Sequence, residues 1–256
     1  MEVVTLASRK GGVSKTTSAR MLGAGLMKEG YSVLYVDLDS QANLTKGLGA
    51  SATTYSSMDV LNGNMSVPEV IQNTQYGDIL AGAEDLDSAD AVITGKGKEY
   101  RLKDALDAVS GLYDYVIIDT PTPLGILTVN ALTAADSVII PVQADKDSLD
   151  GLSLLYKTIT TVKKYSNPAL YIRGILVTRY DGRTIYARSY KANFEDAAAQ
   201  LGTHFFSAPI RECVAVREAK DSQQDIFTYA GRSNAARDYS IFIKEFLEKE
   251  GSTNNG

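Results

Sequence analysis

Two glycines, a lysine and a threonine stand together near the start of the chain, and their types suit the binding of phosphate groups. They are Gly11, Gly12, Lys15 and Thr16. They separate an apolar run over residues 3–7, typical of a buried strand, from a run with helical spacing. Glycines at such a junction let backbone N–H groups converge on phosphate oxygens, while the helix N-terminus and the lysine supply positive charge. The hydroxyl suits magnesium, so the spacing predicts a nucleotide-binding loop.

The loop departs from the ordinary P-loop pattern G-x-x-x-x-G-K-[ST], because Arg9 and Ser14 stand where that pattern has glycine. Residues 10–16 instead resemble the deviant Walker A motif, K-G-G-x-x-K-[ST], of the ParA/MinD family of dimerising ATPases. In that family a signature lysine precedes the glycines and reaches the phosphates bound by the other subunit. The resemblance implies that Lys10 has this role and that the ATP-bound protein is a homodimer. It implies ATP contacts along the whole loop: Lys10, Gly11, Gly12, Val13, Ser14, Lys15, Thr16 and Thr17.

Asp39 follows a second apolar run, at residues 32–37. Parallel strands bring their carboxyl ends to one edge of a sheet, where nucleotides bind, so we expect Asp39 near the phosphates. Residues 36–43 resemble the family's D-x-D-P-Q-G-N segment, whose second aspartate positions the attacking water and helps to hold magnesium through water. The resemblance gives this role to Asp39. The alternative is that Asp39 only caps the following helix.

Asp119 closes a third apolar run and matches a Walker B strand, whose aspartate can hold a magnesium-bound water. The loop over residues 120–125 resembles switch II of the family, which senses the γ-phosphate. The resemblance also places Arg179 and Pro209 near the nucleotide. With ATP and Mg²⁺ as the implied cofactors, the catalytic residues are Lys10, Lys15 and Asp39, and the magnesium residues are Thr16, Asp39 and Asp119.

Four positions in these loops depart from the family's usual residues. Ser14 and Ala42 replace glycines, Ser40 replaces a proline, and Thr122 separates two prolines that are usually adjacent. Glycine adopts a positive φ freely, so Ser14 matters if the loop requires such a φ, whereas a serine at negative φ is tolerated. We expect these changes to alter the paths of the loops and to leave the carboxylate of Asp39 in place.

Apolar runs alternate with segments of helical period along the chain, which predicts an α/β fold with a doubly wound, mostly parallel sheet and right-handed crossovers. The family implies the same deviant Walker P-loop NTPase fold. We expect one ParA-like ATPase domain over residues 1–256, with a flexible tail from about residue 250. The expected strands are at 3–7, 32–37, 115–119, 136–142 and 170–178, with a further one at 78–81.

Composition excludes several classes of protein. The 256 residues are 44% hydrophobic and 22% charged, as in ordinary globular domains. A single cysteine, Cys213, and a single histidine, His204, exclude an internal disulfide and a Cys/His metal cluster. No signal peptide and no window of about 20 apolar residues is present, so we expect a cytoplasmic protein.

Basic residues concentrate between Tyr156 and Lys191, where eight of them accompany one acid, although the whole chain has a net charge of −5. Six tyrosines lie in the same window. Lysine, arginine and tyrosine commonly contact the phosphate backbone of nucleic acids, so the window predicts a DNA-facing patch. The alternative is a solvated surface whose cations pair with acids elsewhere in the fold. The candidate DNA-binding residues, including several outside the window, are Lys157, Arg183, Arg188, Lys191, Arg211, Arg217, Lys220 and Lys244.

The chain is thus interpreted as a small ParA-type partition ATPase whose ATP-bound dimer binds double-stranded DNA without sequence preference. The resemblance implies a ParB-type partner that stimulates hydrolysis and release, and association with the nucleoid. The first strand begins almost at Met1, so we expect no N-terminal helix-turn-helix domain. A MinD-like membrane ATPase is disfavoured, because the C-terminal helix over residues 238–249 is too acidic for lipid. A second alternative is a nucleotide-gated module that anchors a protein cargo on DNA.

Overall fold

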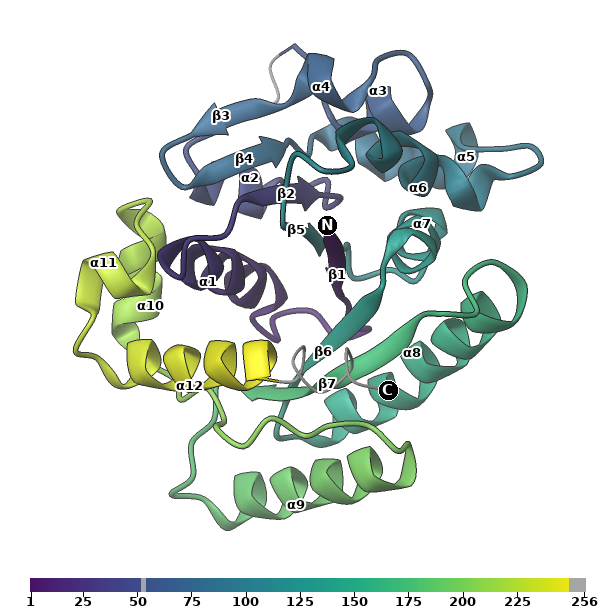
Figure 1. The fold of residues 1–256 in the computed structure, drawn as a ribbon. Coiled ribbons are helices and arrows are strands. Elements are labelled where there is room, and N and C mark those ends of the chain that lie inside the picture. Colours follow the sequence, from purple (N-terminus) through teal and green to yellow (C-terminus); the bar gives the residue numbers. More distant parts are fainter. Residues whose placement is uncertain (52–53, 249–256) are drawn as a thin grey trace.

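The computed structural model describes residues 1–51 and 54–248, and its centre is a seven-stranded sheet (Figure 1). The strands lie in the order β3-β4-β2-β5-β1-β6-β7. Neighbouring strands are parallel except for β3 and β4. This arrangement confirms the expected doubly wound, mostly parallel sheet. The strands are β1 (Glu2–Leu6), β2 (Val33–Asp37), β3 (Gln72–Thr74), β4 (Gly77–Leu80), β5 (Tyr115–Asp119), β6 (Ser137–Gln143) and β7 (Tyr171–Thr178).

All six predicted strands are present, with ends that differ by one residue at most. The edge strand β3 was not predicted. Its three residues, Gln72, Asn73 and Thr74, are polar and offer no apolar run, and the strand exists because it pairs antiparallel with β4. Pairing with a neighbour rather than local sequence therefore defines this edge of the sheet.

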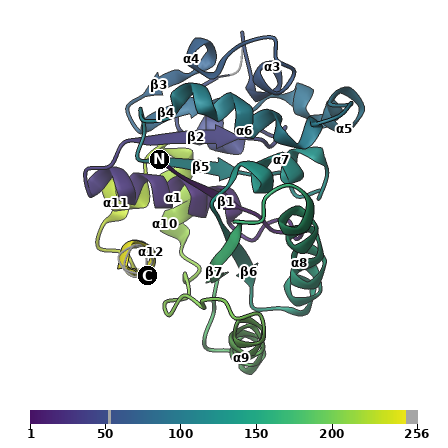
Figure 2. The ribbon, with the colours of Figure 1, turned by 45° about the vertical axis from the view of Figure 1, so that its right-hand side comes forward.

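Helices cover both faces of the sheet (Figures 1 and 2). One hydrophobic cluster joins the sheet to α1, α2, α10, α11 and α12, and a second joins the opposite face to α3–α9. The helices are α1 (Lys15–Lys28), α2 (Asn43–Gly47), α3 (Ser57–Leu61), α4 (Val67–Val70), α5 (Ala89–Val92), α6 (Arg101–Leu106), α7 (Ile126–Ala134), α8 (Lys146–Tyr165), α9 (Ile185–Gln200), α10 (Val214–Asp221), α11 (Ile226–Ala230) and α12 (Asn234–Glu248). Short 3₁₀ turns are η1 (Glu84–Ser88), η2 (Lys98–Tyr100) and η3 (Asp107–Val109).

The register of the central strands gathers the expected site residues at one edge. β5 lies between β1 and β2, and Asp119 at its end is level with both Leu6 and Asp37. Because the three strands are parallel, the loops that follow them leave the sheet at the same carboxyl edge. The phosphate loop, the Asp39 loop and the switch II segment therefore start side by side.

Close packing fixes α1, which carries Lys15, against β2. A Cβ atom at Gly23 would lie 2.3 Å from the hydroxyl oxygen of Tyr35, so only glycine fits there without displacement. The same Tyr35 hydroxyl donates a hydrogen bond of 3.1 Å to the carbonyl of Arg20. The position of α1, and with it the direction of the phosphate loop, is thus set by a buried contact with the sheet.

The C-terminal helix α12 packs on the protein through its aromatic face. Tyr239, Phe242 and Phe246 are at most 1% exposed. Within residues 1–51 and 54–248, no helix combines the length and the apolar character that crossing a bilayer requires. The expected tail from about residue 250 lies outside the described residues.

Candidate functional site

The loop between β1 and α1 requires left-handed backbone conformations at two positions. Gly12 has φ +76°, and Ser14, directly before α1, has φ +55°. The left-handed region costs a residue other than glycine about 1–2 kcal/mol. Ser14 therefore stands where the fold favours glycine, because the loop does use a positive φ at this position. Its hydroxyl makes no capping hydrogen bond to α1 that would compensate.

Lys15 joins the start of α1 to the end of β5. Its side chain is buried, and Nζ lies 3.5 Å from Asp119 Oδ1 and donates a hydrogen bond to the carbonyl of Thr120. The lysine thus lies between the phosphate loop and the first residues of the switch II segment. A cation in this place can neutralise a phosphate that the loop amides hold.

Asp119 offers an unsatisfied carboxylate oxygen to a cation. Its side chain is wholly buried, and Oδ2 has no hydrogen-bond partner within the described ranges. Burial raises the pKa of Asp119, and the neighbouring Lys15 charge and Thr16 hydroxyl oppose that rise. Hard oxygen ligands of this kind suit Mg²⁺, and a buried acceptor without a partner is rare unless something binds it. The residues present therefore fit a magnesium ion held near Thr16 and Asp119.

The two carboxylates after β2 have different surroundings. Asp37 is buried and accepts hydrogen bonds from the backbone N–H of Thr45 (2.9 Å), the Thr45 hydroxyl (2.8 Å) and the Asp39 N–H (3.1 Å). Burial, and secondly the charge of Asp119, raise the pKa of Asp37 to about 7. Asp37 therefore organises the loop rather than facing a ligand.

Asp39, in contrast, lines the cavity beside the phosphate loop. Its Oδ1 accepts a hydrogen bond of 3.0 Å from the N–H of Gln41, which leaves it outside α2. The residue that precedes α2 is Ala42, with φ +50°, again where the family has glycine. The geometry thus argues against a helix-capping role for Asp39 and leaves its side chain at the cavity.

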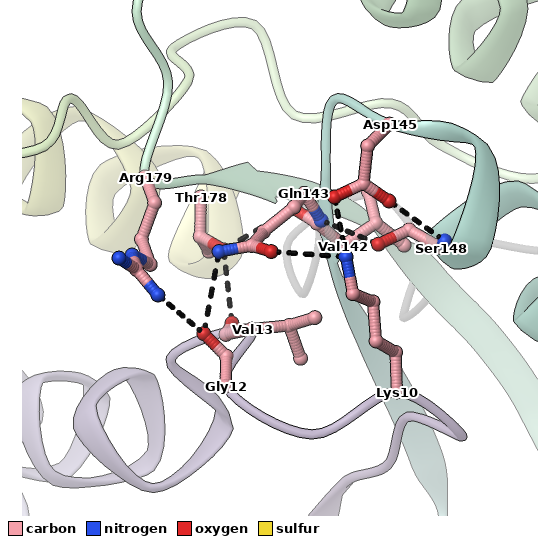
Figure 3. Close-up of polar contacts among 9 residues, drawn as sticks. All are labelled: Lys10, Gly12, Val13, Val142, Gln143, Asp145, Ser148, Thr178 and Arg179. Carbon is pink, nitrogen blue, oxygen red and sulfur yellow. Dashed lines mark hydrogen bonds and ion pairs between the residues drawn. The ribbon is translucent and has the colours of Figure 1, made fainter.

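Lys10 points away from the loop toward the start of α8 (Figure 3). Its Nζ forms an ion pair with Asp145 and donates a hydrogen bond of 3.2 Å to Gln143 Oε1. Asp145 also caps α8 by accepting a bond of 2.9 Å from the N–H of Ser148. Gln143 in turn donates to the carbonyl of Gly12 at 3.4 Å. The lysine is therefore held by contacts within the chain at the rim of the cavity.

The opposite rim of the loop is formed by the end of β7 (Figure 3). Thr178 donates from Oγ1 to the carbonyl of Val13 at 2.9 Å, which ties the loop to the sheet. Arg179 bridges the carbonyl of Gly12 at 3.3 Å and the carboxylate of Glu212 at 3.1 Å. Pro209 is partly buried and is not among the residues that line the cavity, whereas its neighbour Ile210 is.

A cavity of about 520 Å³ opens between these rims, within the usual range for a nucleotide-sized ligand. Its walls are strongly basic, with Asp39 and Glu212 as the acidic lining residues. The basic lining residues are Lys10, Lys15, Arg20, Arg179, Arg211, Arg217 and Lys220. Lining residues that the sequence analysis did not assign to the site include Arg20, Gln41, Asn43, Gly47, Glu212 and Cys213. A signal was present for Gln41 and Asn43, which lie in the segment after Asp39 that resembles the family's motif, and for Arg20, which lies one helical turn after Thr16.

The eight candidate DNA-binding residues do not form one surface. Arg183, Arg188 and Lys191 lie together in α9 and the turn before it, and Lys157 is exposed on α8. Three others line the nucleotide-sized cavity, namely Arg211, Arg217 and Lys220. The last, Lys244, lies on α12 and pairs with Glu248.

Arg211 and Lys220 already have partners inside the protein. Arg211 makes two hydrogen bonds to the carboxylate of Asp238, at 2.9 and 2.6 Å, and Lys220 donates to Asn43 at 3.3 Å. The chain folds back after β7 and brings residues 210–220 over the phosphate loop, which local sequence does not reveal.

Comparison with known proteins gives consistent similarities. A family model described as an AAA domain matches residues 1–172. The chain is 37% identical over 249 residues to the sporulation initiation inhibitor protein Soj of Bacillus subtilis, covering 95% of this chain and 97% of that protein. It is 35% identical to the chromosome partitioning protein ParA of Caulobacter vibrioides, covering 98% and 95%.

A solved structure is also similar over nearly the whole chain. The cobyrinic acid a,c-diamide synthase of Mycobacterium smegmatis, with bound ADP and magnesium, superposes with a TM-score of 0.85 at 34% identity. The match covers 98% of this chain and 96% of that one.

The strain at Ser14 generates a test. Ser14→Gly relieves a left-handed serine and raises the entropy of the unfolded chain, so we expect a net gain of about 0.5–1 kcal/mol in the free energy of unfolding. Urea denaturation measures it. The matched variant Gly12→Ala places a side chain at φ +76° and is expected to lose stability. A Ser14→Gly protein less stable than the wild type would show that the hydroxyl has a stabilising role.

Proposed function

The chain belongs to the ParA/Soj family of partition ATPases, and from this membership we propose that it cycles between an ATP-bound dimer on DNA and free subunits. Its activity is ATP hydrolysis, with ATP and Mg²⁺ as cofactors. The single observation that carries the proposal is Lys10, a second lysine at the rim of the cavity. Its ammonium group contacts Asp145 and Gln143 and does not serve to shape its own loop.

Within one subunit, we assign phosphate binding to the loop amides, the start of α1 and Lys15. Thr16 and Asp119 would hold Mg²⁺, and Asp39 would contribute to holding it through a water molecule. When bound, Mg²⁺ neutralises charge on the transferred phosphoryl group. The role of Asp39 is to orient the attacking water, because its carboxylate faces the cavity while that of Asp37 is occupied by Thr45. Positioning of this kind supplies most of the catalysis in phosphoryl transfer.

Dimerisation follows from the place of Lys10. To contact the phosphates of a second subunit, its ammonium group must exchange the carboxylate of Asp145 for phosphate oxygens. Two nucleotides would then lie between two subunits, each completed by the lysine of the other. ATP binding thereby becomes the condition for a stable dimer.

We assign DNA binding to α9 and its preceding turn, a surface that we call the α9 patch and define as Arg183, Arg188 and Lys191. The Arg183 side chain is 89% exposed and pairs with Asp181, which tethers it without burying it. Arg188 is exposed as well, whereas the Lys191 side chain is 22% exposed and forms an ion pair with Glu195 that DNA phosphates would have to replace. Cations on a protein surface bind the phosphate backbone regardless of sequence. A dimer presents two copies, which makes DNA affinity depend on ATP.

We propose that a ParB-type DNA-bound partner accelerates ATP hydrolysis and that release from DNA follows hydrolysis. A plasmid, mobile element or chromosome region is thereby moved on the nucleoid. No specific observation favours the membrane alternative. The apolar face of α12 is buried against the protein. It is therefore unavailable to insert into lipid.

The trans role of Lys10 is tested by Lys10→Ala. We expect nucleotide binding within a few-fold of wild type and loss of the ATP-induced dimer, because the removed contact belongs to the other subunit. Light scattering with Mg²⁺ and a non-hydrolysable ATP analogue measures the dimer. The exposed Lys96→Ala serves as the matched control. Wild-type dimers of Lys10→Ala would assign the lysine a role within its own subunit.

The α9 patch is tested by the triple change Arg183→Glu, Arg188→Glu and Lys191→Glu. We expect ATP binding and dimerisation to persist, DNA affinity to fall equally for unrelated duplexes, and the slope of log affinity against log salt to drop by about 0.9 for each lost contact. Fluorescence anisotropy across a salt series measures both quantities.

A matched triple change alters the net charge equally on the face that carries α5 and α6: Lys96→Glu, Lys98→Glu and Lys103→Glu. This control separates local contacts from overall repulsion. An α9 triple variant that retains both its affinity and its salt slope would place the DNA elsewhere.

A further inference from the structure

Arg20 is a buried cation that the fold leaves largely without partners. It lies on α1 and is only 5% exposed. Among the residues that the structure describes, its Nε and Nη2 atoms are buried and have no hydrogen-bond partner. Nearly all buried polar atoms in folded proteins are paired, and removing a charge from water is costly unless a counter-charge accompanies it. A ligand that is not part of the chain would supply both.

The neighbouring groups leave Nε and Nη2 of Arg20 without a hydrogen bond among the described residues. The charge of Asp225 raises the pKa of Arg20 against the larger effect of burial, but the Asp225 oxygens accept hydrogen bonds of 2.7–2.9 Å from Phe227 and Thr228 at the start of α11. The ring centre of Tyr76 lies 5.9 Å from Arg20 Cζ, near the limit of a cation–π contact. Burial is the largest influence on the pKa of Arg20 and lowers it.

Arg20 lines the same cavity as the phosphate loop, one turn of α1 beyond Thr16. Arg217 and Lys220 line this cavity from α10. We call these three residues, Arg20, Arg217 and Lys220, the cationic annex. A Cβ atom at Gly47 would lie 3.4 Å from Arg20 Nη1, so the glycine leaves space beside the guanidinium.

The two acidic residues that line the cavity, Asp39 and Glu212, have other partners or roles. Asp39 belongs to the proposed magnesium and water site, and Glu212 pairs with Arg179. The annex therefore adds positive charge beyond what Lys10, Lys15 and the loop provide for a triphosphate.

A purely structural role for Arg20 is the alternative. Its guanidinium lies near α2, whose last carbonyls carry partial negative charge. However, α2 has only five residues, and Nε and Nη2 donate to none of its carbonyls. Such a contact gives no reason for a long charged side chain where an apolar one of equal length would pack.

We propose that the cationic annex binds a second phosphate group, separate from the triphosphate in the loop. Two guanidinium nitrogens of Arg20, Nε and Nη2, have no hydrogen-bond partner among the described residues, and paired donors of this kind suit a tetrahedral oxyanion. The group has two possible sources: inorganic phosphate, which the ATPase reaction itself releases, or a phosphate attached to the ribose of the bound nucleotide. The proposal concerns the cavity alone, so failure of the dimer or of DNA binding leaves it intact.

The first arm of the test uses inorganic phosphate as the probe. The loop is first filled with Mg²⁺ and a non-hydrolysable ATP analogue, so that phosphate cannot bind there. Thermal unfolding is then followed against phosphate concentration, with chloride at matched ionic strength as the reference. We expect the wild-type Tm to rise with phosphate, as mass action requires of a ligand of the native state. Arg20→Met should show at least a tenfold weaker response, and the exposed Arg232→Met a wild-type response.

The same arm separates ligand binding from a structural role through the sign of the change in stability that Arg20→Met causes. Without phosphate, Arg20→Met should be as stable as wild type or more stable, because an unpaired buried charge has been replaced by an apolar side chain. Equal destabilisation of Arg20→Met at every phosphate concentration would make Arg20 structural and overturn the proposal.

The second arm compares the binding of ADP with that of ADP carrying a 3′-phosphate, without the ATP analogue of the first arm. Tighter binding of the 3′-phosphorylated nucleotide by wild type, lost in Arg20→Met, would assign the annex to a ribose phosphate. If Arg20→Met does not fold, the double variant Arg217→Gln, Lys220→Gln replaces it, since both residues are exposed on α10. Absence of any annex-dependent effect in both arms refutes the proposal.

Discussion

The buried contact between Lys15 and Asp119 is the constraint on which the rest of the site depends. One residue begins α1 and the other ends β5, and they meet because β1 and β5 are parallel and in register. An uncompensated buried charge is strongly destabilising, so each residue requires the other, or a phosphate and a metal ion in their place. The pair therefore couples the phosphate loop to the switch II segment, since Lys15 also donates to the carbonyl of Thr120. In the proposed function, nucleotide binding would replace these contacts and would thereby act on the loop that follows β5.

The cationic residues of the proposed nucleotide and DNA sites differ in their burial. Lys15 is buried, Lys10 is held at the rim by Asp145, and the α9 patch lies on the surface. Desolvation strengthens electrostatic interactions inside and salt screens them outside. Phosphate binding by Lys15 should therefore resist salt, whereas DNA binding by α9 should not. This difference is consistent with the proposed cycle, in which DNA contacts form and break around a firmly held nucleotide.

The sequence predicted what is local and failed where distant segments meet. Strand ends, the phosphate loop and Asp119 were predictable because apolar runs and motif spacing are properties of neighbouring residues. The positive φ of Ser14 and Ala42 could be suspected only from the glycines they replace. Arg211 is different: it was assigned to a surface patch, yet it lines the cavity, because the chain returns over the loop after β7. The partners that hold Lys10 and Arg211, namely Asp145 and Asp238, are separated from them by 135 and 27 residues, beyond the reach of local pattern.

Single-turnover hydrolysis by Asp39→Ala, followed together with DNA retention, tests the central claim most directly. A limiting amount of ATP is bound with Mg²⁺, and product formation and DNA dissociation are recorded in the same sample. The account predicts that Asp39→Ala binds ATP, dimerises, hydrolyses at least about a hundredfold more slowly than wild type and stays on DNA. Hydrolysis at the wild-type rate, or release from DNA without hydrolysis, would contradict it.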